Sequence, residues 1–390
     1  MTPTPTSASH PILTGGEPFR LLFPFAVVFG LLGMLLWPAF IWNLLPVYPG
    51  IPHARIMIEC FMGAFVIGFL GTALPRLLDV PRIHFKEALA YATGLSAACG
   101  LHLTNLTFWG DLAFLITFAG FVAGLINRAR QRKDIPPPAF VLVALGLLSA
   151  IAGAILLLLP SPLAYAAGRL LLYQGFLLLP VMGVGAFLLP RFFQLPNRQS
   201  FPESMSPPPG WWPKAGFALG CGLLILISFA VEISGHITLA HVLRATGVLL
   251  YFWQEVPAHK AKFNSGSLAL TLRIALVAIP LGYLISAFWT GHHIAMLHIV
   301  FVTGFGLLTL TVATRVIFGH CGQSHRFKAT VLPVLVMAAL FLGALLLRIW
   351  ADFTPVHRFT LYGIGALVWT VGLLVWSICI LPAVRHPDEE

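Results

Sequence analysis

Charged side chains are scarce in this sequence of 390 residues. They make up 9% of the chain, against about 25% in an ordinary soluble protein, whereas hydrophobic residues make up 58%. A soluble protein of this size needs more polar side chains, because much of its folded surface faces water. The composition therefore excludes a soluble globular protein and predicts one that is embedded in a lipid bilayer.

Cysteine is also rare, and its five copies never stand in a C-x-x-C spacing. The lack of that spacing excludes covalent haem attachment through C-x-x-C-H, a zinc knuckle and an iron–sulfur motif. Any haem in this protein would be bound non-covalently. Four of the five cysteines lie within apolar segments, where a small buried side chain is the expected role.

Long apolar runs dominate what is present. A bilayer core requires about 20 apolar residues of helix. We predict an all-α, polytopic transmembrane bundle over residues 20–382, preceded by a flexible cytoplasmic segment (1–19) and followed by a cytoplasmic tail (383–390). The sequence shows no obvious internal repeat. About twelve spans are predicted, at residues 20–45, 54–75, 88–106, 110–127, 139–159, 165–189, 215–233, 239–254, 268–289, 293–317, 329–349 and 358–382.

Lysine and arginine occur in alternate connections between these segments. Each connection from an even-numbered to an odd-numbered segment is basic, whereas the other connections contain no Lys and have arginines only at segment ends. Basic connections face the cytoplasm, so both termini should be cytoplasmic. The formal charge of +10 then reflects membrane orientation, and we expect no nucleic-acid partner. The arginines on the outer side are Arg55, Arg169, Arg244, Arg348 and Arg358.

Histidine is concentrated on the same outer side. Any one of these residues could simply extend its side chain to the membrane interface. A large group without Lys favours a site instead, because intramembrane ionisable residues tend to face the bundle interior. Imidazoles suit haem iron or copper, and the planar fork of Arg suits haem propionates. The outer histidines are His53, His102, His236, His241, His292, His293, His298 and His357.

Two histidines are the first-choice metal ligands. His53 opens the second segment, and Met57 lies four residues later on the same helix face, where it is either a thioether ligand or a packing residue. His298 is the deepest histidine of the tenth segment and the hardest to explain as an interfacial residue. The reserve ligands are His102, His241, His292 and His293, and the arginines expected to bind a cofactor are Arg55, Arg169 and Arg244.

Arg55 also has a partner four residues away. Arg55 and Glu59 share a helix face that differs from the face of His53 and Met57. A charged pair inside an apolar segment is typical of an intramembrane ion pair. We therefore predict that Arg55 and Glu59 form one.

Three stretches resemble the NnrS family. They are Pro18–Phe25, His53–Pro75 and the segment His298–Gly322, which contains a Thr-Arg-x-x-x-Gly-His-x-Gly pattern. The resemblance extends over most of the chain. It implies a multi-pass protein of the bacterial inner membrane that contains haem and copper and is associated with nitric oxide metabolism and nitrosative stress. Nitric oxide or another small diatomic molecule would then be its ligand.

The sequence departs from the family pattern at one point. The family usually reads His-Ala-His-Glu-Met at the start of the second segment, whereas this chain reads His-Ala-Arg-Ile-Met from His53 to Met57. One histidine that the resemblance implies as a ligand is therefore replaced by Arg55. We expect haem binding on this basis more firmly than copper binding.

Two other interpretations remain open. The outer arginines are also suited to a secondary transporter of a small anion or metal chelate, in which Pro180 and Pro190 would break the sixth segment. A respiratory haem–copper oxidase core is disfavoured, because it needs a full set of histidine ligands and a proton path with intramembrane acids. Only Glu59 and Glu232 are candidates for such acids.

Overall fold

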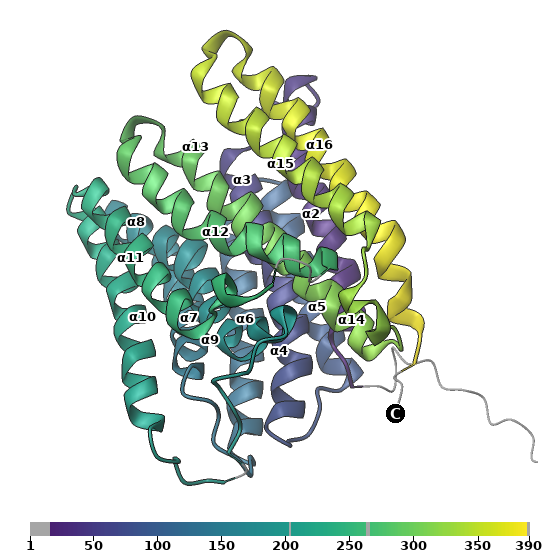
Figure 1. Ribbon diagram of the computed structural model, residues 1–390. Coiled ribbons are helices and arrows are strands. Elements are labelled where there is room, and N and C mark those ends of the chain that lie inside the picture. The colour runs from purple at the N-terminus through teal and green to yellow at the C-terminus, as the bar shows by residue number, and fades with distance from the viewer. Residues whose placement is uncertain (1–15, 203, 263–265, 388–390) are drawn as a thin grey trace, which may run out of the picture.

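This computed structural model describes residues 16–202, 204–262 and 266–387, and every regular element among them is a helix (Figure 1). Helices satisfy their own backbone hydrogen bonds, which a chain surrounded by hydrocarbon requires. The prediction of an all-α bundle is confirmed.

Ten helical segments in the described ranges are long and apolar enough to cross a bilayer. Their number and composition are those of a multi-pass membrane protein. They are α2 (Phe19–Ile41), α3–η1–α4 (Gly50–Leu77), α6 (Thr107–Ala129), α7 (Phe140–Leu157), α8–η2–α9–η3 (Pro162–Phe193), α10 (Trp211–Ile233), α12 (Gly266–Phe288), η5–α13–η6–α14 (Thr290–His320), α15 (Leu332–Phe353) and η8–α16–η9 (Pro355–Arg385).

The two remaining predicted spans, 88–106 and 239–254, correspond to α5 (Phe85–Leu103) and α11 (Ile237–Glu255), each of 19 residues. Both are full-length helices, but neither belongs to the ten apolar segments. Polar residues explain this, since α5 has Lys86 and Glu87 in its first turn and α11 contains Arg244. The count of twelve crossings and the cytoplasmic placement of the termini stay predictions.

Three long helices change their winding in the same way. Each begins as a short α-helix, widens into a π-helical segment and continues as an α-helix. Counted with α5 and α11, they are the second, sixth and tenth long helices, so the described chain forms three successive four-helix units (19–129, 140–255 and 266–380). The π-helical segments are η1 (Ile56–Met62), η2 (Leu171–Gly175) and η6 (Ile299–Gly306).

A glycine contact repeats in each of these units. The first helix of each unit contains a glycine that faces the π-helical segment of the same unit: Gly33 faces η1, Gly153 faces η2 and Gly282 faces η6. A Cβ atom added to them would lie 3.0, 2.8 and 2.6 Å from an atom of that segment, respectively. Such small residues allow helices to approach closely in membrane bundles. The structure thus contains a threefold repeat that the sequence does not reveal.

The two ends of the described chain meet at one end of the bundle, here called the terminal end. Arg20 donates hydrogen bonds of 2.6 Å to the carbonyl oxygens of both Val384 and His386. Its Nε lies 2.6 Å from a carboxylate oxygen of Glu17, which also pairs with His320 at 2.9 Å. Residues 1–15 of the predicted flexible segment lie outside the described residues, while Glu17 is buried.

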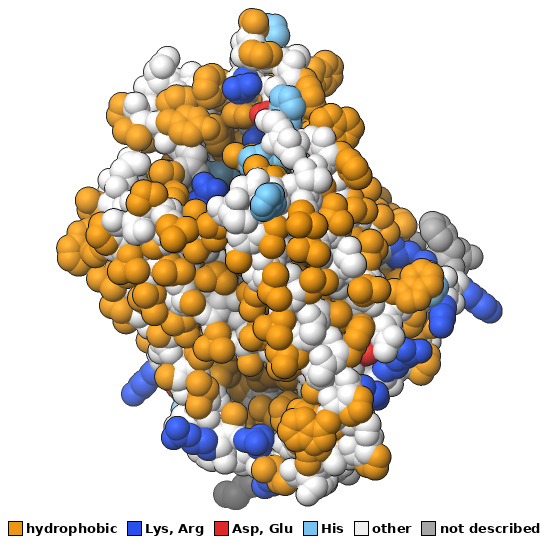
Figure 2. All heavy atoms as spheres, turned by 90° about the vertical axis from the view of Figure 1, so that its left-hand side faces the viewer, with side chains coloured by type: hydrophobic (Ala, Val, Ile, Leu, Met, Phe, Trp, Pro, Cys, Tyr) orange, Lys and Arg blue, Asp and Glu red, His pale blue; other side chains and the backbone are white. Residues whose placement is uncertain are grey.

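The opposite end of the bundle, here called the cavity end, has a different surface. Figure 2 shows histidine, basic and acidic side chains around a hollow near that end, above a broad hydrophobic band. Further Lys and Arg side chains gather toward the other end of the view. The polar hollow and these basic side chains therefore lie at opposite ends of an apolar surface.

Candidate functional site

A cavity of about 450 Å³ opens at the cavity end of the bundle. We call it the histidine cavity. Its volume lies within the range of about 300–1,000 Å³ that is typical of small-molecule and cofactor sites. All three π-helical segments contribute to its wall, together with α2, α15 and α16. It is therefore built where the three units meet.

His53 lies in α3 (Gly50–Arg55) and faces this cavity. Its Nδ1 lies 3.0 Å from the carbonyl oxygen of Gly33, and its ring packs against the edge of Trp37, with ring centres 5.7 Å apart. A carbonyl oxygen only accepts hydrogen bonds, so Nδ1 carries the proton in this contact. The lone pair of a neutral imidazole then lies on Nε2, which is the arrangement found in metal-binding histidines.

His298 is the last residue of α13 (His293–His298) and lines the same cavity. Its Nδ1 lies 2.7 Å from the carbonyl oxygen of Ile294. The protonated nitrogen is again fixed by a backbone carbonyl, which leaves Nε2 as the lone-pair atom. The two first-choice histidines thus line the same cavity and have the same tautomer, with the proton on Nδ1.

Arginine residues line part of the histidine cavity. Arg169 is exposed to it and lies over the ring of Tyr165, at 5.7 Å. Arg348 also lines it, lies 4.5 Å from the ring centre of Tyr362, and has a carboxylate oxygen of Asp352 at 3.6 Å. Two guanidinium groups therefore face a cavity whose wall is otherwise largely apolar.

Arg55 does not line the cavity; it belongs to a buried ion cluster on the other side of η1. We call this group, formed by Arg55, Glu59, His102, Asp111 and Tyr173, the Arg55 cluster. Arg55 Nε lies 2.7 Å from Asp111 Oδ1 and 3.5 Å from Glu59 Oε1, and Arg55 also donates to the Tyr173 hydroxyl. His102 Nε2 lies 2.9 Å from Glu59 Oε2. The predicted pair of Arg55 and Glu59 is present within a larger network.

The Arg55 cluster also has the ligand types of a metal site. Ligand atoms of Glu59, His102 and Asp111 all lie within 4.8 Å of one another. However, the guanidinium of Arg55 already contacts oxygens of both carboxylates. A cation there would be repelled by Arg55, which neutralises the carboxylates in its place. We therefore treat His102 as part of a structural network.

Arg244, in α11, lies beside the cavity and is completely buried. Its Nε donates to the Ser228 hydroxyl at 2.8 Å, and Nη1 donates to Gln174 Oε1 at 2.9 Å. It also pairs with Glu232. Gln174 and Glu232 line the cavity, whereas Arg244 does not. Arg244 therefore contacts Gln174 and Glu232 from outside the cavity and helps to position them in its wall.

His241 is completely buried, and both of its ring nitrogens lack a hydrogen-bond partner among the described residues. Its ring centre lies 6.4 Å from that of His293, which lines the cavity, and 6.1 Å from that of Tyr283. The described residues also provide no hydrogen-bond partner for the Tyr283 hydroxyl. Buried polar atoms are nearly always satisfied, so this group points to a bound water, ion or ligand.

Two other predicted ligands are engaged in simpler contacts. His292 pairs with Asp352 at 2.8 Å and lies outside the cavity wall. Met57 lines the cavity, and its sulfur lies close to Gly33, at 3.0 Å from the Cβ position there. His292 therefore has a structural partner, while Met57 both packs against α2 and faces the cavity.

Sequence reasoning missed three important residues. Asp111 completes the Arg55 cluster, Tyr173 joins that cluster to the cavity wall, and Trp37 supports His53. A signal existed only for Asp111, since a carboxylate inside a predicted span is costly unless it is paired. Aromatic residues are so frequent in these segments that Tyr173 and Trp37 do not stand out.

Comparison with known proteins gives one result. No curated protein matches the chain. A family profile described as NnrS protein matches residues 15–387, which is nearly the whole chain. The chain therefore belongs to the NnrS family.

Proposed function

We propose that this protein binds haem in the histidine cavity, with His53 and His298 as iron ligands, and acts in nitric oxide metabolism or the response to nitrosative stress. The observation that carries the proposal is the pair of histidines facing one cavity, each with Nδ1 donating to a backbone carbonyl. That arrangement fixes the ring and keeps Nε2 available for a metal. Membership of the NnrS family supports the role in nitric oxide metabolism.

The rest of the wall suits a haem group. Aromatic side chains such as Trp37 and Trp369 supply apolar surface, and Arg169 and Arg348 would pair with propionate carboxylates. Haem iron would supply a redox-active centre that binds small diatomic molecules. The chain's own residues orient the two imidazoles and exclude bulk water. The basic residues at the opposite end of the bundle favour an outer-face location of this cavity in a bacterial inner membrane.

An optical spectrum of the purified protein tests this proposal. Wild type expressed with ample haem should show a Soret band, and His53→Ala and His298→Ala should each lose it or shift it strongly. His292→Ala is the matched control, because His292 pairs with Asp352 outside the cavity wall, and it should keep the wild-type spectrum. A wild-type protein without a Soret band would contradict the proposal.

Copper is the second metal in the proposal, and we place it beside His241 and His293. The unpartnered ring nitrogens of His241 support this assignment, since neutral imidazole is a common copper ligand. Metal analysis should find copper in wild type and much less in His241→Phe, with the haem spectrum retained. Equal copper in both proteins would exclude His241 as a ligand.

A transporter of small anions is the alternative function. Arg169 and Arg348 in the cavity favour it. The helix α8–η2–α9 (Pro162–Leu170, Leu171–Gly175 and Phe176–Leu188) changes its winding at η2 but continues through Pro180 without a break. Anion flux into proteoliposomes that is abolished by Arg169→Gln, with haem absent, would support this alternative over the haem proposal.

A further inference from the structure

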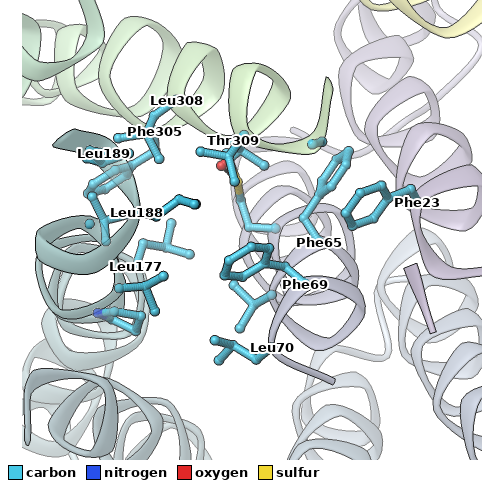
Figure 3. A pocket seen from close by; sticks show the side chains of 18 residues that line it. Phe23, Phe65, Phe69, Leu70, Leu177, Leu188, Leu189, Phe305, Leu308 and Thr309 are labelled. Atoms are coloured by element: carbon cyan, nitrogen blue, oxygen red, sulfur yellow. Dashed lines mark hydrogen bonds between the residues drawn. The ribbon is translucent and has the colours of Figure 1, made fainter. Parts of the chain in front are cut away.

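A second cavity lies deeper in the bundle, between α4 (Gly63–Leu77), α9 and α14 (Leu307–His320). We call it the inner cavity. Figure 3 shows its wall, formed by side chains such as Phe69, Leu177 and Phe305 that come from three sides. Its volume is about 90 Å³. Among the described residues that line it, Thr309 is the only one whose side chain has an oxygen or nitrogen atom, and its hydroxyl is directed to the sulfur of Met62 at 3.6 Å.

The inner cavity continues the histidine cavity toward the terminal end. Met62 and Leu177 line both cavities. Beyond them, each central helix presents one face at helical spacing, which is the stripe expected of residues three or four apart. The stripes are Met62, Val66 and Phe69; Leu177, Val181, Val184 and Leu188; and Phe305, Thr309 and Val312. The two cavities therefore adjoin at Met62 and Leu177 and follow one another along the three helices that carry the π-helical segments.

The wall of the inner cavity decides which molecules fit. A buried water needs two to four hydrogen-bond partners, and the one hydroxyl in the wall is already directed to a sulfur atom. A charged solute would lose its hydration without gaining an opposite charge. The volume exceeds that of one water but is far too small for a cofactor. A small, uncharged and weakly polar molecule matches all three constraints.

A simple packing defect explains the space less well. Empty volume in a protein interior lowers stability in proportion to its size, and membrane bundles usually close such gaps by side-chain packing. Here three helices leave the gap together, next to a second cavity, over about two to three turns each. The space is thus a product of the bundle's central arrangement.

We propose that the inner cavity binds small uncharged gas molecules and conducts them between the histidine cavity and the terminal half of the bundle. Gas binding in the inner cavity is independent of any cofactor. Only the target of the gas, a metal in the histidine cavity, rests on the proposed function.

Xenon is the probe for gas binding, because it is uncharged and occupies dry apolar cavities. Xenon-pressurised crystals of wild type should show the atom in the inner cavity. Thr309→Phe, which adds a ring to a partly exposed residue of the wall, should abolish that site. Leu346→Phe adds a ring on the outer surface of α15, where the side chain is 67% exposed, and should leave xenon bound. Thr309→Leu, a smaller change, provides a second test and should weaken the xenon signal.

Two results would overturn gas binding: wild type without xenon in the inner cavity, or full xenon occupancy in both Thr309 variants. This experiment requires no haem. If the purified protein lacks a Soret band but binds xenon, the proposed function fails and the gas site stands. If the Soret band is present and xenon is absent, gas binding in the inner cavity fails and the haem proposal stands.

Passage is tested on haem-loaded protein by flash photolysis of bound carbon monoxide. A blocked inner cavity should remove part of the space into which the released gas escapes. Thr309→Phe should therefore show more rapid recombination and a slower bimolecular phase than Leu346→Phe. Identical traces for the two variants would contradict a role of the inner cavity in gas movement.

Discussion

The histidine cavity and the Arg55 cluster lie on opposite faces of the same helix, and they treat their polar groups differently. His53 and Met57 face the cavity, whereas Arg55 and Glu59 face α5 and α6. In the cluster, the charged groups pair with one another. In the cavity, His53 and His298 each use one ring nitrogen for a backbone carbonyl, and the other has no hydrogen-bond partner among the described residues.

This difference distinguishes a structural role of the cluster from the proposed binding role of the cavity. Two carboxylates beside one guanidinium in an apolar interior are stable only while they remain together, so the cluster contributes to holding η1 against its neighbours. Fixed imidazoles beside an open cavity are prepared for a ligand. Histidine alone does not distinguish the two, since His102 and His53 lie on neighbouring helices with different tasks.

The largest expected effect concerns the cluster. Asp111→Asn removes one of the two carboxylates that pair with Arg55. Among the described residues, Glu59 is then the acidic partner that remains. Breaking a buried pair in this way should lower the free energy of unfolding by about 3 kcal/mol. Unfolding in mixed detergents measures it. The folded fraction should keep the wild-type haem spectrum, because no cavity residue is changed.

Asp79→Asn is the control for that substitution. Asp79 and Lys133 form an ion pair at 3.1 Å whose side chains are both 79% exposed. Such pairs contribute little to stability, so this variant should unfold like wild type. If Asp111→Asn also unfolded like wild type, the claim that the Arg55 cluster stabilises the fold would be wrong.

A second effect tests whether the terminal end resembles the Arg55 cluster. Burial raises the pKa of Glu17, but the hydrogen bond and charge of His320, and then those of Arg20, outweigh it and lower the pKa from 4.5 to about 2. Because the folded pKa is depressed, the stabilisation is complete above about pH 4.5 and is lost as the pH falls toward 2.

Glu17→Gln should therefore lower the free energy of unfolding at neutral pH by about 2–3 kcal/mol. The difference between variant and wild type should shrink as the pH falls from about 4.5 toward 2. Thermal unfolding at a series of pH values provides the measurement. A difference that does not vary over that window would show that the carboxylate charge of Glu17 is not what stabilises the terminal end.

The smallest effect concerns the cavity wall. Arg169 is exposed, so its attraction for a propionate is screened by solvent and salt. Arg169→Gln should weaken haem binding roughly fivefold, about 1 kcal/mol, without changing the stability of the haem-free protein. Haem titration at low and high salt measures this, and the effect should be smaller at high salt. If the haem-free variant were instead less stable than wild type, Arg169 would have a structural role.

Several features followed from the sequence because they depend on local composition. Helical spans follow from long apolar runs, and the family follows from motifs that include His53 and Gly322. The preference for His298 over His292 rested on depth in the span, and the structure places His298 at the cavity and His292 beside Asp352.

Other features depend on contacts that the sequence does not encode locally. Asp111 lies 56 residues from Arg55, and nothing in an apolar span specifies its neighbouring helices. The π-helical segments have no distinctive composition, since Ile56–Met62 and Ile299–Gly306 consist of residues that also favour α-helix or strand. The threefold repeat is one of backbone geometry and small-residue contacts, and the side chains around it differ between units.

The closure of the chain by Arg20 has a consequence for biogenesis. Because proteins are made from the N-terminus onward, His53 is inserted early, while His298 and the wall from α15 and α16 arrive last. The two histidines come from the first and third units, so neither unit alone forms the histidine cavity. Loading of the proposed haem would therefore be a late step, after the C-terminal residues have reached Arg20. A truncation that removes Val384 and the residues after it would weaken that final closure.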